Sequence, residues 1–199
     1  MLNYDEKFSN KLNSRIKGES LMTFPDDYTV IDIETNGLNS AIDDIIELSA
    51  IRVREGKIVK TFSKLVKPQR PVGRFISNLT GIKNAMLENE HSIEEVLPDF
   101  LEFVGKDTIL GHNINFDINF IYDKSIKYFN KAFSNSYVDT LKIARKLKLD
   151  CENHKLQTLA DYYKIKSGRM HRGLEDCRVT FEVYKCLKTY VLAKMAEFM

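Results

Sequence analysis

The sequence predicts one domain of the mixed α/β class, built on a five-stranded mixed sheet that is flanked by helices. Three observations support this prediction. Three strand-like segments come first, shorter strand-like segments then alternate with helical patterns, and no internal repeat or low-complexity linker divides the 199 residues. A chain that begins with consecutive strands and then alternates strands with helices is typical of a sheet with both antiparallel and parallel strand pairs. With 43% hydrophobic residues, the chain can bury a sizeable core.

The first three strands are predicted between residues 28 and 66. The stretch "YTVIDIETNGL" alternates with a period of two from Tyr28 to Thr35 and is rich in β-branched residues, as in a strand. The segment "IIELSAIRVREGKIVKTFSKLVKP" predicts two long strands joined by a hairpin turn at Glu55 and Gly56. Three antiparallel strands should therefore open the domain.

Helices and two short strands should make up the rest of the chain. Ser92 and Glu95 have the spacing of a capping box and begin a helix, which Pro98 should kink if it lies beyond the first turn. Asp139 has the position of an N-cap for a helix that ends at Leu147. The other predictions are short helices within 71–90, strands in "DTILGH" and "SYVDT", and helices over about 115–129, in "KLQTLADYY" and over about 174–196.

Residues 1–25 differ in pattern from the rest and are predicted to be an amphipathic helical appendage, with the main domain at 26–199. One face would carry the cations Lys7, Lys11, Arg15 and Lys17, and another the apolar residues Phe8, Leu12 and Ile16. This appendage should dock on the domain.

Composition excludes several classes of protein. The chain has no apolar run of about 18 residues and no apolar signal-peptide centre, so a cytoplasmic protein without membrane contact is expected. Three cysteines without a C-x-x-C pair favour reduced thiols over a disulfide framework or zinc site. The net charge of +2 does not indicate a nucleic-acid binder. Locally, "YKIKSGRMHRG" is basic, and Arg172 in it is a candidate phosphate contact, although a solvated loop is an equal alternative.

Four acids and one histidine are the candidate catalytic residues. Asp32 and Glu34 would share one face of the first strand, where burial and like charge both disfavour ionisation. Asp117 lies at the edge of an apolar helix face, and Asp176 lies near the start of the last helix, five residues after His171. Each acid alone could be a helix cap or a surface residue. Four acids that all lie near the ends of helices or strands and beside apolar residues indicate that they belong to one functional site.

A divalent metal would explain why the fold accepts these acids. Mg²⁺ and Mn²⁺ prefer oxygen ligands, and their charge reverses the repulsion between neighbouring carboxylates. Two such ions about 4 Å apart suit the in-line hydrolysis of a phosphodiester. A neutral imidazole such as that of His171 could then take a proton from the attacking water.

Three motifs in order resemble those of one enzyme family. "DIETNG", "HNINFD" and "HRGLED", together with "LTGI" at residues 79–82, resemble the motifs of the DEDDh 3′–5′ exonucleases, a group that includes the proofreading subunit or domain of bacterial replicative polymerases. The resemblance covers residues 28–188. It implies a ribonuclease H-like fold and release of nucleoside 5′-monophosphates from the 3′ ends of single-stranded or frayed nucleic acid, with DNA favoured.

The resemblance also implies roles for individual residues. Asp32, Glu34, Asp117 and Asp176 would bind two metal ions, Mg²⁺ or Mn²⁺, and His171 would be the general base. The 3′-terminal nucleotide would contact Thr35, Asn36, Gly37, Leu38, Asn113 and Phe116, with Leu38 wedged at the bases and Phe116 equally suited to the core. His112 is the nearest alternative base, but the resemblance favours a packing role for it.

Some residues depart from the family pattern. Gly173 stands where alanine is frequent, and Asn36 stands where a second threonine often occurs. The sequence stops at Met199, soon after the last predicted helix, so a polymerase partner would be bound without a C-terminal tail. "LQTLADYY" resembles a sliding-clamp peptide, but its leucines fit a buried helix better.

Three other functions remain alternatives. One is an RNA-trimming or short-oligonucleotide exoribonuclease of the same family. Another is a HAD-type phosphatase, because "VIDIET" resembles an Asp-x-Asp motif, although Glu34 replaces its second aspartate. The third is a catalytically silent module that binds nucleic-acid ends, against which the intact acids argue, since binding alone needs positive charge.

Overall fold

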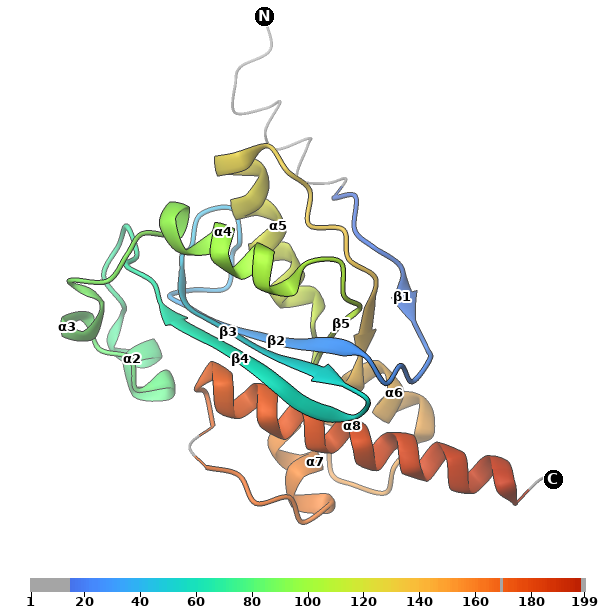
Figure 1. Cartoon of the computed structure of the whole chain (residues 1–199). Helices are drawn as coiled ribbons and strands as arrows, with labels where there is room; N and C mark the ends of the chain where they lie inside the picture. Colours follow the sequence, from blue (N-terminus) through green and yellow to red (C-terminus); the bar gives the residue numbers. More distant parts are fainter. Residues whose placement is uncertain (1–14, 169, 198–199) are drawn as a thin grey trace, which may run out of the picture.

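The computed structural model describes residues 15–168 and 170–197, and a six-stranded sheet lies at its centre. The strand order is β1-β6-β5-β2-β3-β4 (Figure 1). The strands are β1 (Ser20–Leu21), β2 (Tyr28–Thr35), β3 (Ile45–Arg54), β4 (Lys57–Leu65), β5 (Ile109–Gly111) and β6 (Tyr137–Asp139). The β2, β3 and β4 strands are antiparallel, whereas β5 pairs in parallel with β2 and with β6. The predicted mixed α/β class is therefore confirmed.

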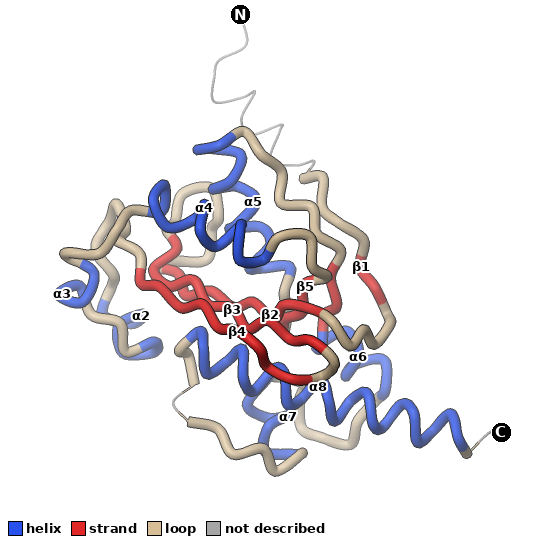
Figure 2. The backbone as a smooth tube through the Cα atoms, in the orientation of Figure 1, coloured by secondary structure: helices blue, strands red, loops and turns tan. Residues whose placement is uncertain are grey.

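Helices cover both faces of this sheet. They are α2 (Arg74–Thr80), α3 (Asn84–Leu87), α4 (Ile93–Val104), α5 (Asn115–Phe129), α6 (Thr140–Leu147), α7 (Leu156–Tyr162) and α8 (Gly173–Ala196). Figure 2 shows α4 and α5 on one side of the strands and α7 and α8 on the other. Among the described residues, no helix is long and apolar enough to cross a membrane.

Each face of the sheet carries its own hydrophobic core. On the side of α4 and α5, aromatic and aliphatic residues such as Phe100 and Phe120 pack on Ile31 and Leu48 of the sheet. On the side of α6, α7 and α8, the core includes Tyr28, Val30 and Tyr184. Because alternate residues of β2 enter the two cores, β2 is buried on both faces and forms a rigid centre for the domain.

Local sequence signals account for most element boundaries. Glu55 and Gly56 both have positive φ, 49° and 70°, as a tight hairpin turn requires. The backbone N–H of Ser92 donates to Glu95 Oε2 at 2.8 Å, which confirms the capping box of α4. Asp139 accepts from the N–H of Leu141 at 3.0 Å and confirms the N-cap of α6. The α4 helix continues through Pro98.

The sixth strand and the N-terminal segment differ from the predictions. Residues 15–25 form no helix, and β1 pairs in parallel with β6, with the N–H of Tyr137 donating to the carbonyl of Glu19 at 2.8 Å. A Cβ on Gly18 would lie 2.1 Å from the carbonyl oxygen of Asn135, so this segment lies close to the sheet edge. The helix predicted there is therefore wrong for these residues, and its remainder, 1–14, lies outside the described residues.

The close contact between α8 and β3 gives a stability prediction. An alanine Cβ at position 173 would lie 2.6 Å from Ser49 Oγ and 2.8 Å from Ser49 Cβ. We expect Gly173→Ala to lower the free energy of unfolding by about 1–3 kcal/mol, because overpacking forces the backbone to shift. In a Ser49→Gly background, the same change should cost less than about 0.5 kcal/mol. Urea denaturation of the four proteins measures both costs, and equal costs in the two backgrounds would contradict the prediction.

Candidate active site

Two acids project from the end of β2 toward the start of α8. Asp32 lies opposite Ser49 of β3, and Glu34 lies opposite Glu47. Side chains of directly paired residues lie on the same face of a sheet, so all four share one face. Gly173, the first residue of α8, contacts this face, because its N–H donates to Glu47 Oε2 at 3.1 Å. The predicted pair of acids is therefore placed where the sheet meets a helix N-terminus.

The α5 helix supplies the third acid. Asp117 lies in its first turn, directly after the short strand β5, and is buried. Its Oδ1 accepts a hydrogen bond from the N–H of Ile33 at 3.0 Å, which fixes the carboxylate between the two acids of β2. The side chain thus reaches the site from the opposite layer of helices.

The fourth acid and the histidine come from α8 and the loop before it. Asp176 lies in the first turn of α8, and its Oδ2 accepts from the N–H of His171 at 3.0 Å. His171 has a φ of 60°, and its side chain is exposed. Donor atoms of Glu34, His171 and Asp176 all lie within 4.8 Å of one another. The structure therefore brings together the acids and the histidine that the motifs predict.

Burial, together with the charges of neighbouring acids, disfavours ionisation of the four acids. Burial raises the pKa of Glu34 to about 8, and the charges of Asp176 and Glu47 add to this effect. Burial also raises the pKa of Asp117 to about 8 and of Asp176 to about 6. For Asp32, burial and then the charge of Asp117 raise the pKa well above its usual range. Without a counter-charge, part of this site must be protonated at neutral pH.

The donor set fits divalent cations. Asp32 Oδ2 and Asp176 Oδ1 are buried and have no hydrogen-bond partner among the described residues. Buried carboxylate oxygens without a donor are costly, and the remedy for a group of them is a cation with oxygen-preferring coordination. Such a cation would also lower the raised pKa values, since it favours the ionised form of each ligand.

Glu47 is a fifth acid of the site, and the sequence interpretation missed it. It is 1% exposed, and it is paired with Arg172, whose Nη2 lies 3.2 Å from Glu47 Oε1. Because Glu47 also accepts from the N–H of Gly173, it ties β3 to the loop that carries His171. A glutamate between Ile46 and Leu48 in a continuous apolar strand is the signal that could have revealed it.

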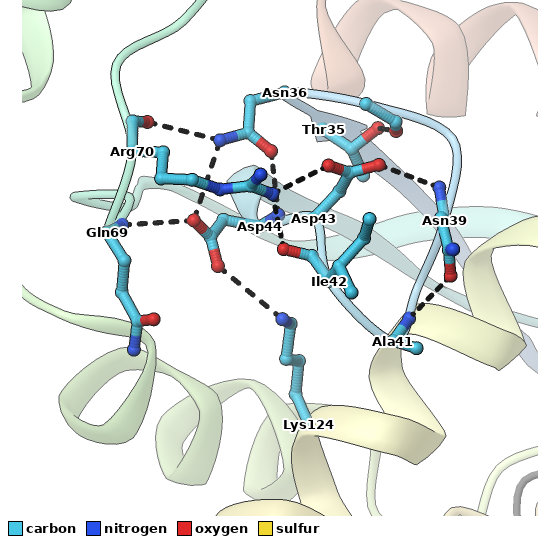
Figure 3. Close-up of polar contacts among 11 residues, drawn as sticks. Thr35, Asn36, Asn39, Ala41, Ile42, Asp43, Asp44, Gln69, Arg70 and Lys124 are labelled. Atoms are coloured by element: carbon cyan, nitrogen blue, oxygen red, sulfur yellow. Dashed lines mark hydrogen bonds and ion pairs between the residues drawn. The ribbon is translucent and has the colours of Figure 1, made fainter. Parts of the chain in front are cut away.

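The predicted substrate segment, residues 35–38, leads into a loop, residues 36–44, that is held by its own polar contacts (Figure 3). The side chain of Asn36 accepts from the N–H of Asp44 at 2.7 Å and donates to the carbonyl of Arg70 at 3.1 Å. Thr35 Oγ1 donates to the carbonyl of Gly37 at 2.6 Å, and a Cβ on Gly37 would lie 2.2 Å from Asp43 Oδ2. The side chains of Thr35 and Asn36 thus form hydrogen bonds within the protein. A side chain at position 37 would have to displace the carboxylate of Asp43.

A second set of contacts fixes the same loop to its surroundings. Asp44 accepts from the N–H of Gln69 at 3.0 Å and forms an ion pair with the buried Lys124 of α5 at 3.5 Å. Arg70 lies 2.8 Å from Asp43 (Figure 3). These contacts leave Leu38 83% exposed at the tip, as its predicted role at the substrate bases requires.

The residues around Asn113 have mainly structural partners. The N–H of Asn113, which has a φ of 61°, donates to Asp139 Oδ1 at 3.0 Å. His112 Nδ1 lies 2.9 Å from Thr140 Oγ1, and burial lowers the pKa of His112 to about 4. Phe116 is half-buried and packs on Phe120, with 4.9 Å between ring centroids. His112 is therefore a packing residue, as the sequence interpretation favoured.

Comparison with known proteins gives four matches. The sequence model of the exonuclease family, RNase_T, matches residues 29–184. The chain is 41% identical over 169 residues to a DNA polymerase III of PolC type from Caldanaerobacter subterraneus, a match that covers 85% of this chain and 12% of that polymerase. It is 40% identical over 157 residues to the DNA polymerase III epsilon subunit of Aquifex aeolicus, covering 79% of this chain and 78% of that subunit. A solved structure of exonuclease X in complex with 5′-overhanging duplex DNA has a TM-score of 0.65 and 26% identity, covering 82% of this chain and 92% of that one.

The raised pKa values predict a pH-dependent stability of the metal-free protein. Each acid has a higher pKa when folded than when unfolded, so the folded state binds more protons between about pH 4 and 8 and stability falls as pH rises through this window. In EDTA we expect the Tm to drop by at least about 5 °C from pH 5.5 to 8, and millimolar Mn²⁺ should restore most of the loss. Differential scanning fluorimetry measures this, with Asp117→Asn expected to lose less. A flat Tm in EDTA would contradict the prediction.

Glu47 should hold the loop before α8 in place. At about pH 5.5, Glu47→Ala should lower the free energy of unfolding by about 2–4 kcal/mol, because Arg172 and the N–H of Gly173 lose their acceptor. Glu47→Gln keeps an acceptor and should lose less than half of that. Urea denaturation, combined with Arg172→Ala in a double-mutant cycle, should give a coupling energy of at least about 0.5 kcal/mol. Additive costs would show that the pair is not coupled.

Proposed function

This chain belongs to the exonuclease family, and on that basis we propose that it is a DEDDh-type 3′–5′ exonuclease that uses two divalent ions, Mg²⁺ or Mn²⁺. The observation that carries the proposal is the grouping of four carboxylates and one exposed histidine at the end of β2. The phosphatase alternative rested on the segment "VIDIET" alone. The exonuclease family model matches residues 29–184, so it favours a nuclease over a phosphatase.

The acids would hold the cations, and the histidine would handle the proton. Asp32, Glu34, Asp117 and Asp176 would be the ligands, and two unpartnered carboxylate oxygens support this role. When bound, the ions would supply positive charge against the negative charge that develops on the phosphate. The exposed ring of His171 can accept the proton of an attacking water.

The bond changes follow from this arrangement. Water attacks the terminal phosphorus, and its proton passes to His171. The bond between phosphorus and the 3′-oxygen of the preceding nucleotide then breaks. That oxygen keeps the electron pair and takes up a proton from solvent water to become the new 3′-hydroxyl, and a nucleoside 5′-monophosphate is released. The fixed loop 36–44, with Leu38 exposed at its tip, would receive the terminal nucleotide.

Single-stranded or frayed DNA is the substrate that the comparisons favour. The similar proteins are a PolC-type polymerase and an epsilon subunit of DNA polymerase III, and the similar exonuclease X was solved with 5′-overhanging duplex DNA. A polymerase is therefore the partner that we propose. An exoribonuclease of the same family is the alternative. Residues 26–199 would be the exonuclease domain, with 1–25 as its appendage.

The proposed activity predicts which substitutions abolish cleavage. On 5′-labelled single-stranded DNA with Mg²⁺ or Mn²⁺, the wild type should give a ladder that shortens from the 3′ end, and EDTA should stop it. Asp117→Asn should lower the rate at least about a hundredfold, because a metal ligand is lost. His171→Gln should still bind metal but slow turnover by about 10²–10⁴-fold. The exposed acid Glu102, changed to glutamine, is the matched control and should retain full activity.

The same assay on other substrates separates the alternatives. Faster cleavage of single-stranded RNA than of single-stranded DNA or a mismatched duplex would favour RNA trimming. Full activity of His171→Gln would contradict its role as base. No cleavage with either metal would replace the proposal with a silent module that binds nucleic-acid ends.

A further inference from the structure

A pocket of about 660 Å³ adjoins two of the proposed catalytic residues, His171 and Asp176. It is lined by α6, by the segment that leads into α7, and by His171 and Asp176. None of the residues 35–44 lines it. Of the residues predicted to contact the terminal nucleotide, Asn113 alone lines the pocket, whereas Leu38 lies outside it.

Two unpaired cations give this pocket its charge. Arg145 of α6 and Lys155 before α7 both line it, both are exposed, and neither forms an ion pair with an acid of the described residues. Of the described residues that line the pocket, Asp176 alone is acidic. A cationic pocket directly beside a strongly anionic centre is unusual for packing alone, and it suits an anion that spans both regions.

The pocket also holds an unpartnered donor or acceptor. His154 Nε2 is buried and lacks a hydrogen-bond partner among the described residues. The neighbouring His112 uses its Nδ1 for Thr140 Oγ1. Since His154 is one of the residues that line the pocket, an unsatisfied polar atom belongs to the pocket lining.

Apolar side chains complete the lining. Leu141, Leu156 and Met170 also line the pocket. All three are partly buried, so each presents part of its apolar surface there. Positive charge combined with apolar surface is the pattern that binds phosphates and bases of a single strand.

We propose that this pocket binds the nucleotides of single-stranded DNA that lie on the 5′ side of the scissile phosphate. The proposal rests on the exonuclease function proposed above. Arg145 and Lys155 contact upstream phosphates, and the apolar wall receives an upstream base or sugar. The strand then runs from this pocket, past His171 and Asp176, to the loop that carries Leu38.

A substrate without upstream nucleotides tests this assignment. The 4-nitrophenyl ester of thymidine 5′-monophosphate has the terminal nucleotide and the scissile phosphate but no upstream phosphate. For Arg145→Ala/Lys155→Ala, we expect the KM for the oligonucleotide (dT)10 to rise about tenfold with kcat nearly unchanged. The KM for the nitrophenyl ester should stay at the wild-type value.

A control with the same change of charge isolates the pocket. Lys131 and Lys146 are exposed and lie outside the pocket lining, so Lys131→Ala/Lys146→Ala should leave both KM values unchanged. An unchanged KM for (dT)10 in the pocket variant would overturn the proposal. An equal rise in the KM for the nitrophenyl ester would also overturn it, because the pocket would then bind the terminal nucleotide. An equal rise in the KM of the control variant for (dT)10 would overturn it as well.

A binding measurement keeps this proposal separate from the proposed activity. Fluorescence anisotropy of 5′-fluorescein-(dT)10 with Ca²⁺ gives affinity at several salt concentrations without requiring cleavage. Loss of two phosphate contacts should reduce the slope of log affinity against log salt by about 1.4. A reduced slope with an inactive wild type would support the pocket while the proposed activity fails, and an unchanged slope would overturn the pocket.

Discussion

The burial of several carboxylates in one place, where they also repel one another, is the constraint on which this structure depends. Asp32 and Glu34 are fixed by the ladders on both sides of β2, and Glu47 faces them from β3. Asp117 and Asp176 arrive from two helices in opposite layers. Because each carboxylate is held by buried backbone, the site cannot relax by letting a side chain swing into water, and the raised pKa values record that cost. A cation is the physical remedy for this cost, and it is the basis of the metal-dependent function proposed above.

The fold limits this cost by the way in which it presents the acids. Asp117 and Asp176 both lie in the first turn of a helix, where the free N–H groups and the helix dipole favour negative charge. Backbone N–H groups of Ile33 and His171 donate to these two carboxylates. Glu47 has a partner of its own in Arg172, so that the basic loop before α8 contributes to the site's geometry. The ion pair gives Arg172 a structural role, and its predicted contact with substrate stays a prediction.

The surfaces beside the acids differ in a way that suits a polyanionic strand. On one side, a loop locked by Asn36, Asp43 and Asp44 exposes a single leucine, which suits contact with a base. On the other side, a pocket with unpaired cations would offset the repulsion between the strand and the anionic centre. Positive charge is thus concentrated locally in a chain whose net charge is only +2.

The sequence by itself determined the order of strands and helices, the hairpin at Glu55, the caps at Ser92 and Asp139 and the four acids, because each depends on residues close together in the chain or on a motif. Only the tertiary structure decided the rest. The partners of Glu47 and the pairing of β1 with β6 join residues more than 100 positions apart, and no local pattern encodes such contacts. The pocket at Arg145 is likewise formed by segments that are adjacent only after folding, since its walls come from α6, the α7 approach and the start of α8. Local sequence patterns therefore indicated the candidate catalytic residues, whereas long-range packing decided which side chains are tied up in contacts within the protein and which are not.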